Sequence, residues 1–272
     1  MGLALMKGAA GIAGGKNIGF TDVELSKAHA AAELIGACVF NSNGEAVENG
    51  DYIFLAVKPQ VLADVLKEIA PIIKRRLASG EIPVLISMAA GWSIKKIQDI
   101  AGQGPSKQPA VLAPVLRIMP NTPALVSMGM IALAASAEVP PEKISALETI
   151  LGAAGAVDRI DEKYFDAVTG LSGSGPAFVY MFIEALTDGA VRAGLPRDKA
   201  LRYAARTVLG SAAMVEQTGR HPGELKDMVC SPGGSTIAGL AVLEEGALRG
   251  TVMRAVEAAW RRSAELGACG AF

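Results

Sequence analysis

The stretch Asp51-Tyr-Ile-Phe-Leu-Ala-Val-Lys-Pro59 decides how the first half of this sequence is expected to fold. Residues 51–57 form an apolar run rich in β-favouring side chains, and Lys58-Pro59 ends it. Residues 60–74 follow with apolar side chains at helical spacing. A buried strand that leads directly into an amphipathic helix is the repeating unit of a parallel α/β sheet.

The same alternation continues on both sides of this stretch. Further strands are predicted at residues 18–20, 37–40, 83–88, 115–119 and 130–134. Helices are predicted at residues 24–35 and after Ser93, whose side chain is expected to cap the helix. The sequence therefore predicts a doubly wound parallel sheet over residues 1–158.

The character of the sequence changes after residue 159, where strand-like runs nearly vanish. Ala-rich helical patterns follow at residues 176–193, 197–218, 235–244 and 246–266. We therefore expect a second, all-α domain over residues 159–272.

Composition and charge narrow the functional class. Hydrophobic residues make up 51% of the 272 residues and charged ones 19%, enough to bury a large core. The net charge is −1 and the basic residues are not clustered, so we expect no nucleic-acid or anionic-membrane partner. The longest apolar region, residues 109–137, is broken by three prolines, Arg117 and Asn121, which argues against a membrane span.

The cysteines and the first residues of the chain indicate the cellular location that we expect for the protein. Cys38, Cys230 and Cys269 are few and far apart, which argues against a disulfide framework or a zinc site. The opening residues do not read as a secretory signal, so a cytoplasmic location is expected.

Three loops are expected at one edge of the predicted sheet, where parallel strands end and ligands bind. They contain Lys58-Pro59, Ala89-Ala90-Gly91 and Pro120-Asn121-Thr122-Pro123. Each one alone is typical of an ordinary strand-to-helix turn. Three on the same edge favour a cofactor cleft.

A dinucleotide site should also show G-x-G-x-x-G after its first strand, and this fingerprint is absent. The chain opens with a helical pattern over residues 1–8, in which Gly2 fits the third fingerprint glycine. Gly11, Gly14 and Gly15 follow as a glycine-rich, helix-ending turn. The first strand and the first two glycines are therefore expected to be missing, and we expect an in-frame strand ending in Gly-x-Gly to be encoded upstream of Met1.

The second half contains two glycine-rich segments, residues 170–176 and 231–236, that we expect to be loops leading into helices. Successive backbone N–H groups at a helix start can bind a carboxylate without a basic side chain. A tight turn would need the same residues, so either role is open for each segment alone. His29 and His221 are expected to be structural or solvent-exposed, and no metal site is expected.

Taken together, these motifs resemble the pyrroline-5-carboxylate reductase family along nearly the whole chain. The most specific part is the block from His221-Pro222-Gly223 to Cys230-Ser-Pro-Gly-Gly-Ser-Thr-Ile237. The other matching motifs are residues 54–59, 89–91, 119–124 and 170–177.

The resemblance implies a reductase that converts (S)-1-pyrroline-5-carboxylate to L-proline with NADPH or NADH, the last step of proline biosynthesis. It implies a Rossmann-like domain followed by a helical dimerisation domain of the type found at the C-terminus of 6-phosphogluconate dehydrogenase. Subunits of the family pair through that domain and often build a decamer from dimers.

The resemblance also implies roles for individual residues. Thr236 would be catalytic, because it matches the hydroxyl that hydrogen-bonds the ring nitrogen of the substrate. The substrate-binding residues would be Ser231, Gly233, Gly234, Ser235 and Thr236. The cofactor-binding residues would be Met1, Gly2, Thr21, Asn43, Ala56, Val57, Lys58, Pro59, Ala90 and Asn121.

Two rival functions and the cofactor preference stay open. A β-hydroxyacid dehydrogenase would carry a lysine on the first long helix of its helical domain, and residues 176–193 have none. Without its first strand the chain could instead be an inactive or impaired dinucleotide-fold subunit. Asp22, near the end of the second strand, favours NADH, whereas Thr21 could accept the 2′-phosphate of NADPH.

Overall fold

The computed structural model describes residues 1–102 and 112–268. Cys269 and the first residues of the apolar region that starts at Pro109 lie outside these ranges. The chain forms two compact units, one of Met1–Gly173 with Ala259–Phe272 and one of Ser174–Ala258.

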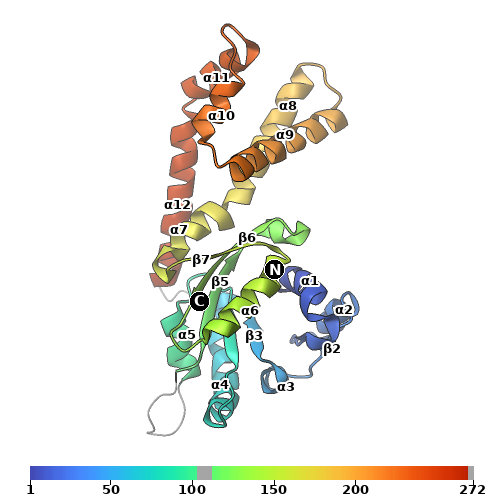
Figure 1. Cartoon of the computed structure of the whole chain (residues 1–272), viewed down its shortest axis with the longest axis vertical. Helices are drawn as coiled ribbons and strands as arrows, with labels where there is room; N and C mark the ends of the chain where they lie inside the picture. The colour runs from blue at the N-terminus through green and yellow to red at the C-terminus, as the bar shows by residue number, and fades with distance from the viewer. Residues whose placement is uncertain (103–111, 269–272) are drawn as a thin grey trace. The chain divides into compact units, whose positions relative to one another are not determined.

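The first unit is built on a five-stranded sheet in the order β3-β4-β5-β6-β7 (Figure 1). Its strands are β3 (Tyr52–Leu55), β4 (Val84–Ser87), β5 (Val115–Pro120), β6 (Gly129–Ala135) and β7 (Gly155–Arg159). Strands β3, β4 and β5 are parallel, as predicted. Leu55 pairs with Ser87, and Ser87 pairs with Arg117, so the carboxyl ends of β3 and β4 lie side by side.

The prediction of an all-parallel sheet is wrong at β6, which runs antiparallel to β5. Residues 121–128 are the whole connection, made of the 3₁₀ turn η3 (Thr122–Val126) and Ser127 with φ 58. A parallel neighbour would need a crossover of roughly a dozen residues or more. Strand β7 then lies parallel to β6 after the helix α6 (Pro141–Gly152). Neither α6 nor β7 was predicted. For β7 the burial pattern gives the reason, since most of its residues are exposed.

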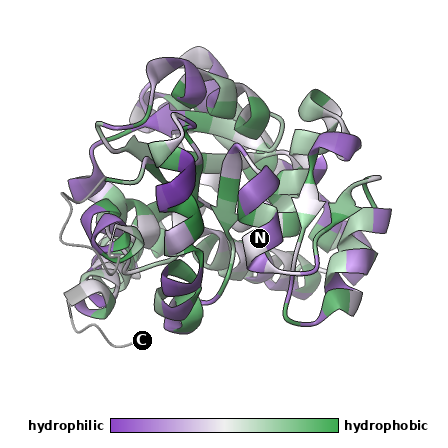
Figure 2. Ribbon diagram, turned by 90° about the horizontal axis from the view of Figure 1, so that it is seen from below, coloured by the Kyte–Doolittle hydropathy of each residue, from purple (hydrophilic) through white to green (hydrophobic). Residues whose placement is uncertain are grey.

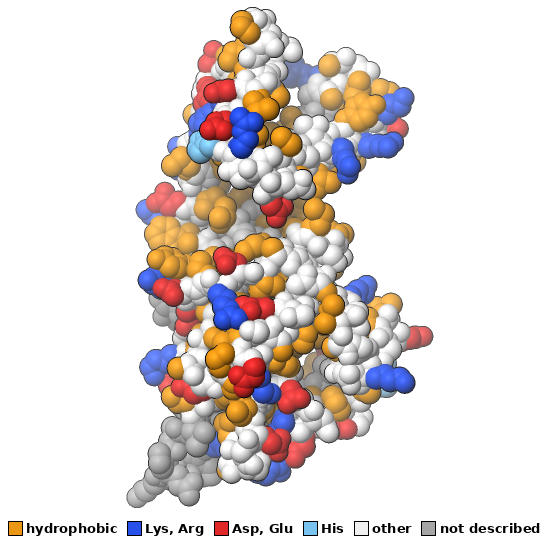
Figure 3. Space-filling model, in the orientation of Figure 1, with side chains coloured by type: hydrophobic (Ala, Val, Ile, Leu, Met, Phe, Trp, Pro, Cys, Tyr) orange, Lys and Arg blue, Asp and Glu red, His pale blue; other side chains and the backbone are white. Residues whose placement is uncertain are grey.

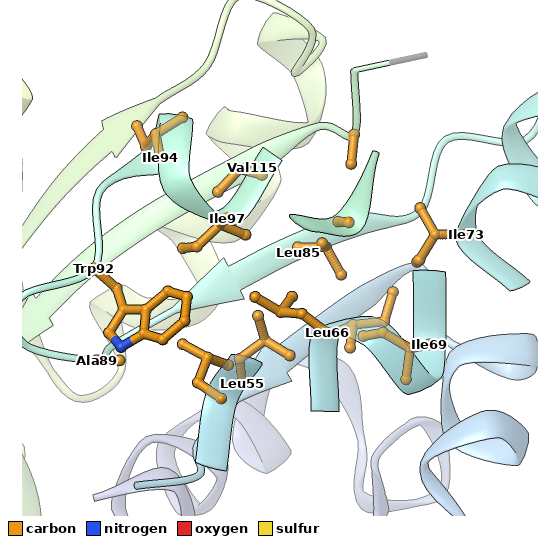
Figure 4. Packing of buried hydrophobic residues seen from close by; sticks show 14 of the residues in the cluster. Leu55, Leu66, Ile69, Ile73, Leu85, Ala89, Trp92, Ile94, Ile97 and Val115 are labelled. Atoms are coloured by element: carbon orange, nitrogen blue, oxygen red, sulfur yellow. The ribbon is translucent and has the colours of Figure 1, made fainter. Parts of the chain in front are cut away.

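Helices cover both faces of this sheet. Figure 4 shows α4 (Leu62–Ala78) and α5 (Ile94–Ala101) packing on β3 and β4 through Leu66, Ile69 and Ile97. The opposite face is covered by α1 (Gly2–Ala13) and α6. Along the helical ribbons of Figure 2, hydrophobic and hydrophilic colours alternate, as they do in amphipathic helices.

A second, separate sheet consists of β1 (Gly19–Phe20) and β2 (Cys38–Val39), flanked by α2 (Leu25–Glu33). In the part of the chain that the structure describes, it is not hydrogen-bonded to β3. Among the described residues, β1 and β2 therefore form a sheet of their own. The predicted opening helix is confirmed as α1, and Gly14 ends it with φ 81. It runs past residue 8 to Ala13, so Gly11 lies inside the helix and not in the predicted turn.

The second unit is helical, as predicted. It contains α8 (Gly175–Arg192), α9 (Arg197–Thr218), α10 (Pro222–Met228), α11 (Ser235–Glu245) and the first half of α12 (Leu248–Ala268). Helices α8 and α9 pack side by side as a hairpin (Figure 1). Among the described residues, no helix is both long enough and apolar enough to cross a membrane.

The segment around Gly170 differs from its prediction as a loop. After the short helix α7 (Phe165–Val168), Thr169–Gly173 forms a π-helical turn, η5, and only then does α8 begin. Phe165 is 1% exposed in the core of the first unit. This anchor explains why the compact units divide at Gly173 and not after residue 158, where the sequence predicts the boundary.

Candidate functional site

The carboxyl edge of β3, β4 and β5 carries the three loops that the sequence singles out. Because β3 and β4 are paired up to Leu55 and Ser87, the loops that start at Ala56 and Met88 are neighbours. Val57 is half-buried, and Ala56 and Lys58 are exposed. The edge is therefore open to a ligand that lies across the strand ends.

The N-terminus of α1 lies against the first of these loops. A Cβ atom added to Gly2 would come within 2.9 Å of the Ala56 Cβ, so any larger residue would push the helix away from β3. This close helix–strand approach is the role of the third fingerprint glycine. The structure thus brings Met1, Gly2 and Ala56 together. The side chain of the N-cap residue Met1 does not cap α1, and N–H groups at a helix start are suited to binding a phosphate.

Lys58 and Pro59 form the next part of the edge. Lys58 has an extended backbone, with φ −63 and ψ 145, and Pro59 opens the 3₁₀ turn η2 (Pro59–Val61). Within the described residues the Lys58 ammonium has no hydrogen bond or ion pair, and it is exposed. An unpaired cation at a strand end is suited to binding a phosphate group.

The loop after β4 is held from two sides. Gly91 has φ +74, and a Cβ atom there would lie 3.2 Å from the carbonyl oxygen of Leu266 in α12. Trp92, next in the chain, donates its indole N–H to the carbonyl of Pro59 at 3.2 Å. Ser93 caps α5 by accepting the N–H of Lys96, which confirms that prediction. The backbone around Ala90 is therefore fixed before any ligand arrives.

Asn121 at the end of β5 is engaged within the protein. Its side-chain oxygen, Oδ1, accepts the backbone N–H of Met130 at 3.0 Å. Its side-chain nitrogen, Nδ2, donates to the Ser172 hydroxyl at 3.2 Å. The side chain closes the turn between β5 and β6 and ties it to η5. Its cofactor contact stays a prediction.

Thr21 and Asn43 lie on other elements. Thr21 follows β1 and is half-buried, and Asn43 is the first residue of α3 (Asn43–Asn49). The Asn43 amide donates to the Glu68 carboxylate at 2.9 Å. In the described structure no hydrogen bond joins either residue to the strand-end loops, so their cofactor roles also stay predictions.

In the second unit, the segment 231–236 forms a tight turn that opens α11. Gly233 has φ +67, a conformation that favours glycine, and the Gly234 N–H donates to the Ser231 carbonyl at 3.0 Å. Ser231, Ser235 and Thr236 are exposed, and within the described residues their hydroxyls make no hydrogen bond.

The first backbone N–H groups of α11 have no partner inside the helix. Gly234 is the N-cap of α11 and has no side chain to satisfy them. Within the described residues, the turn therefore presents unpaired N–H and O–H donors at one helix start, an arrangement suited to binding a carboxylate.

Lys226 and His221, which are close to this turn in the sequence, both make hydrogen bonds within the protein. The Lys226 ammonium donates to Asp227 at 2.6 Å, and this hydrogen bond raises the pKa of Lys226, which keeps it protonated. His221 caps α10 by accepting the Gly223 N–H at 3.1 Å, and His29 is exposed on α2. Over the described ranges, no group of three or more metal-ligating side chains comes together.

Trp92 is the site residue that the sequence did not reveal. Its partner Pro59 lies far away in the chain, so no local pattern shows their hydrogen bond. A large aromatic residue inside an otherwise small-residue turn, Ala89-Ala90-Gly91-Trp92, was the available signal.

We expect Gly91→Ala to weaken the binding of NADH and NADPH about fivefold to tenfold, because the new Cβ would press on Leu266 and shift the loop around Ala90. Gly80→Ala is the matched control, since Gly80 has φ +87 but no atom within 4 Å of an added Cβ. Both variants should lose stability of about 1 kcal/mol from the left-handed backbone. Nucleotide titration followed by fluorescence measures the difference, and equal affinities for both variants would contradict it.

Comparisons with known proteins agree with this architecture. The sequence model described as "Pyrroline-5-carboxylate reductase dimerisation" matches residues 162–266, and one described as "NADP oxidoreductase coenzyme F420-dependent" matches residues 1–91. A pyrroline-5-carboxylate reductase of Glycine max is 45% identical over 236 residues, which are 87% of this chain and 81% of the relative. One of Methanosarcina acetivorans is 43% identical over 269 residues, which are 98% of this chain and 94% of the relative.

Solved structures give the same result. A pyrroline carboxylate reductase of Plasmodium falciparum with NADP bound matches with a TM-score of 0.82 and 32% identity, over 98% of this chain and 95% of that one. A pyrroline-5-carboxylate reductase of Coxiella burnetii matches with a TM-score of 0.84 and 31% identity, over 97% and 93% of the two chains. The chain has three loops at a parallel strand edge in one unit and a donor-rich helix start in the other. Together with its identity to these relatives, this shows that the chain belongs to the pyrroline-5-carboxylate reductase family.

Proposed function

We propose that this chain reduces (S)-1-pyrroline-5-carboxylate to L-proline with NAD(P)H, the last step of proline biosynthesis. The observation that carries the proposal is the turn Ser231–Thr236, whose exposed hydroxyls and free N–H groups start α11 in a chain of this family. That turn offers donors for a carboxylate and for a ring nitrogen without a catalytic acid, base or metal.

The nucleotide fits the residues present in the first unit. The helix α1 approaches β3 so closely at Gly2 that the space a Cβ would need is already filled, which is the packing a dinucleotide site requires. Lys58 and the first N–H groups of α1 would hold its phosphates. When bound, NAD(P)H supplies the hydride that converts the C=N bond of the substrate to an amine.

The residues of this chain orient the substrate and handle its charges. The N–H groups at Gly233 to Thr236 and the hydroxyls of Ser231 and Ser235 hold the carboxylate. The Thr236 hydroxyl hydrogen-bonds the ring nitrogen, which gains electron density as C5 accepts the hydride and must be protonated. One such hydrogen bond contributes about 1–3 kcal/mol, so most of the rate enhancement comes from positioning.

We expect Thr236→Ala to lower kcat/KM for pyrroline-5-carboxylate by about 10- to 100-fold, because it removes that one hydrogen bond. Thr149→Ala is the control, since Thr149 is exposed on α6 and donates only to the Ser145 carbonyl. Steady-state oxidation of NADPH measures both. Unchanged kinetics in Thr236→Ala would remove this residue from the mechanism.

The native chain distinguishes the proposal from an inactive dinucleotide-fold subunit. We propose an active enzyme, and its substrate-dependent oxidation of NADPH or NADH is the direct assay. A folded chain that neither binds these nucleotides nor oxidises them would support the inactive subunit instead.

The choice between NADPH and NADH depends on the end of β1. Asp22 is exposed and its carboxylate accepts the Glu24 N–H at 2.9 Å, so its negative charge is held next to Thr21. A fixed carboxylate near the ribose repels a 2′-phosphate and favours a free 2′-hydroxyl. We propose that the chain accepts both nucleotides and that Asp22 biases it toward NADH.

We expect Asp22→Asn to raise the ratio of kcat/KM for NADPH to that for NADH by about fivefold to tenfold, the effect of roughly 1 kcal/mol of charge repulsion. The asparagine oxygen can still accept the Glu24 N–H, so the start of α2 should not change. Glu24→Gln removes a nearby charge that is paired with Lys27 and serves as the control. An unchanged ratio in Asp22→Asn would rule out this bias.

The chain carries the dimerisation region of its family over residues 162–266. The helices of the second unit expose many large apolar side chains, and Figure 3 shows apolar groups among the charged ones on this unit. Examples are Tyr180, Met181, Tyr203, Val242 and Met253. Burying such side chains is the main driving force for stable association. We propose a dimer formed through these helices, further dimers assembling into a decamer, and a cytoplasmic location.

We expect Met253→Glu to raise the dimer dissociation constant at least tenfold, because Met253 is 72% exposed on α12 and a buried charge there would be costly. Thr149→Glu places the same charge on the exposed side of α6 and is the control. Light scattering over a concentration series gives the mass of each variant. A Met253→Glu protein with the mass of the native one would exclude Met253 from the interface.

A further inference from the structure

We propose that the indole N–H of Trp92 is a positioning group for the nucleotide, because it sets the separation of the two loops that follow β3 and β4. The inference rests on the proposed function in one respect, namely that NADH or NADPH binds at these loops. Trp92 itself acts through the backbone of Pro59 and is a positioning residue, not a catalytic one.

The hydrogen-bond pattern singles out this contact. The backbone pairing of β3 with β4 stops at Leu55 and Ser87. Beyond that point, in the described part of the chain, the bond from the Trp92 indole to the Pro59 carbonyl at 3.2 Å is the one hydrogen bond that joins the two loops. Without it, each loop would keep its contacts with other elements, such as that of Gly91 with Leu266, but no described hydrogen bond would join the two loops to each other.

The indole is fixed in place by its surroundings. Trp92 is 2% exposed, and Figure 4 shows its ring beside Ala89 and Leu55. The Lys96 ammonium lies 4.2 Å from the centre of the ring. Because a close-packed ring cannot turn freely, its N–H points at one acceptor.

The Pro59 carbonyl has a second donor, the N–H of Leu62, which caps the end of η2. Loss of the indole bond would therefore not leave this carbonyl without a partner, and the fold should survive. What would be lost is the fixed spacing between Lys58 on one loop and Ala90 on the other. A dinucleotide that spans both loops is sensitive to that spacing, since loop ordering before binding reduces the entropic cost of binding.

The experiment compares Trp92→Phe with the native chain by direct titration of NADH and NADPH in the absence of substrate. We expect nucleotide Kd and KM to rise about fivefold, which corresponds to the roughly 1 kcal/mol of a neutral hydrogen bond. The value of kcat at saturating nucleotide and the KM for pyrroline-5-carboxylate should stay within about twofold of native. A melting temperature lowered without any change in nucleotide Kd would overturn the proposal.

Lys96→Met is the matched control, because it removes the charge above the ring and leaves the indole N–H in place. Its nucleotide Kd should equal the native value. Equal weakening in both variants would show that packing around the ring matters and the hydrogen bond does not, which would also overturn the proposal.

A second variant keeps the test valid if phenylalanine leaves too large a cavity. Trp92 and Trp260 are the two tryptophans of the chain, and Trp260 is 45% exposed. In a Trp260→Phe background, residue-specific incorporation of benzothienylalanine replaces the N–H of Trp92 by sulfur and keeps the shape of the ring. The same rise in nucleotide Kd is expected, and native affinity would refute the role of the N–H.

These results are separable from the proposed function. A native chain that binds NADPH but does not reduce pyrroline-5-carboxylate would contradict the proposed reaction and leave the Trp92 test intact. An active native chain with a Trp92→Phe variant of native nucleotide affinity would contradict only the present inference.

Discussion

The parallel pairing of β3 with β4 is the constraint on which the edge proposed to bind the nucleotide depends. Because both strands run the same way and end in register, their loops start from neighbouring points. Three features of the edge build on that arrangement: the start of α1 against Ala56, the exposed Lys58, and the turn around Gly91. An antiparallel pair would have sent the two loops to opposite ends of the sheet.

The turn proposed to bind the substrate follows a different physical principle. A basic side chain would bind a carboxylate strongly, but it would also bring a mobile charge next to an imine nitrogen whose charge changes during the reaction. The turn Ser231–Thr236 offers fixed dipoles instead, directed by Gly233 and by the first turn of α11. Such donors cost no reorganisation when charge shifts, which is how preorganised backbone groups favour a transition state.

Much of the fold could be predicted because apolar runs and helical spacing are local signals. Strands β3, β4 and β5 and the long helices of the second unit follow from them. The direction of β6 could not be predicted in the same way, since an apolar run carries no direction and only the short connection through Ser127 sets it. The π-helical turn at Thr169–Gly173 has the composition of a loop, and its helical form depends on the anchoring of Phe165 in the core.

The candidate site shows the same division between local and distant signals. Gly2 was identified because the helical pattern that opens the chain is a local signal, and the structure gives it the expected close approach to Ala56. The link from Trp92 to Pro59 joins distant parts of the chain and has no local signature. Asn121 was recognised by its motif, yet both ends of its side chain serve the β5–β6 turn and η5, which a motif cannot reveal.

The helix α12 starts in one compact unit and ends in the other, and this has a consequence for dissecting the molecule. Its last turns belong to the first unit and pack on the rest of it. The Ser263 hydroxyl donates a hydrogen bond to Asp166, and Leu266 lies close to Gly91. A fragment ended after residue 173 would lack both contacts and would expose the turn beside Ala90. The first unit is therefore discontinuous in sequence. A chimera that exchanges the helical unit between two relatives would have to take the end of α12 from the same relative as residues 1–173.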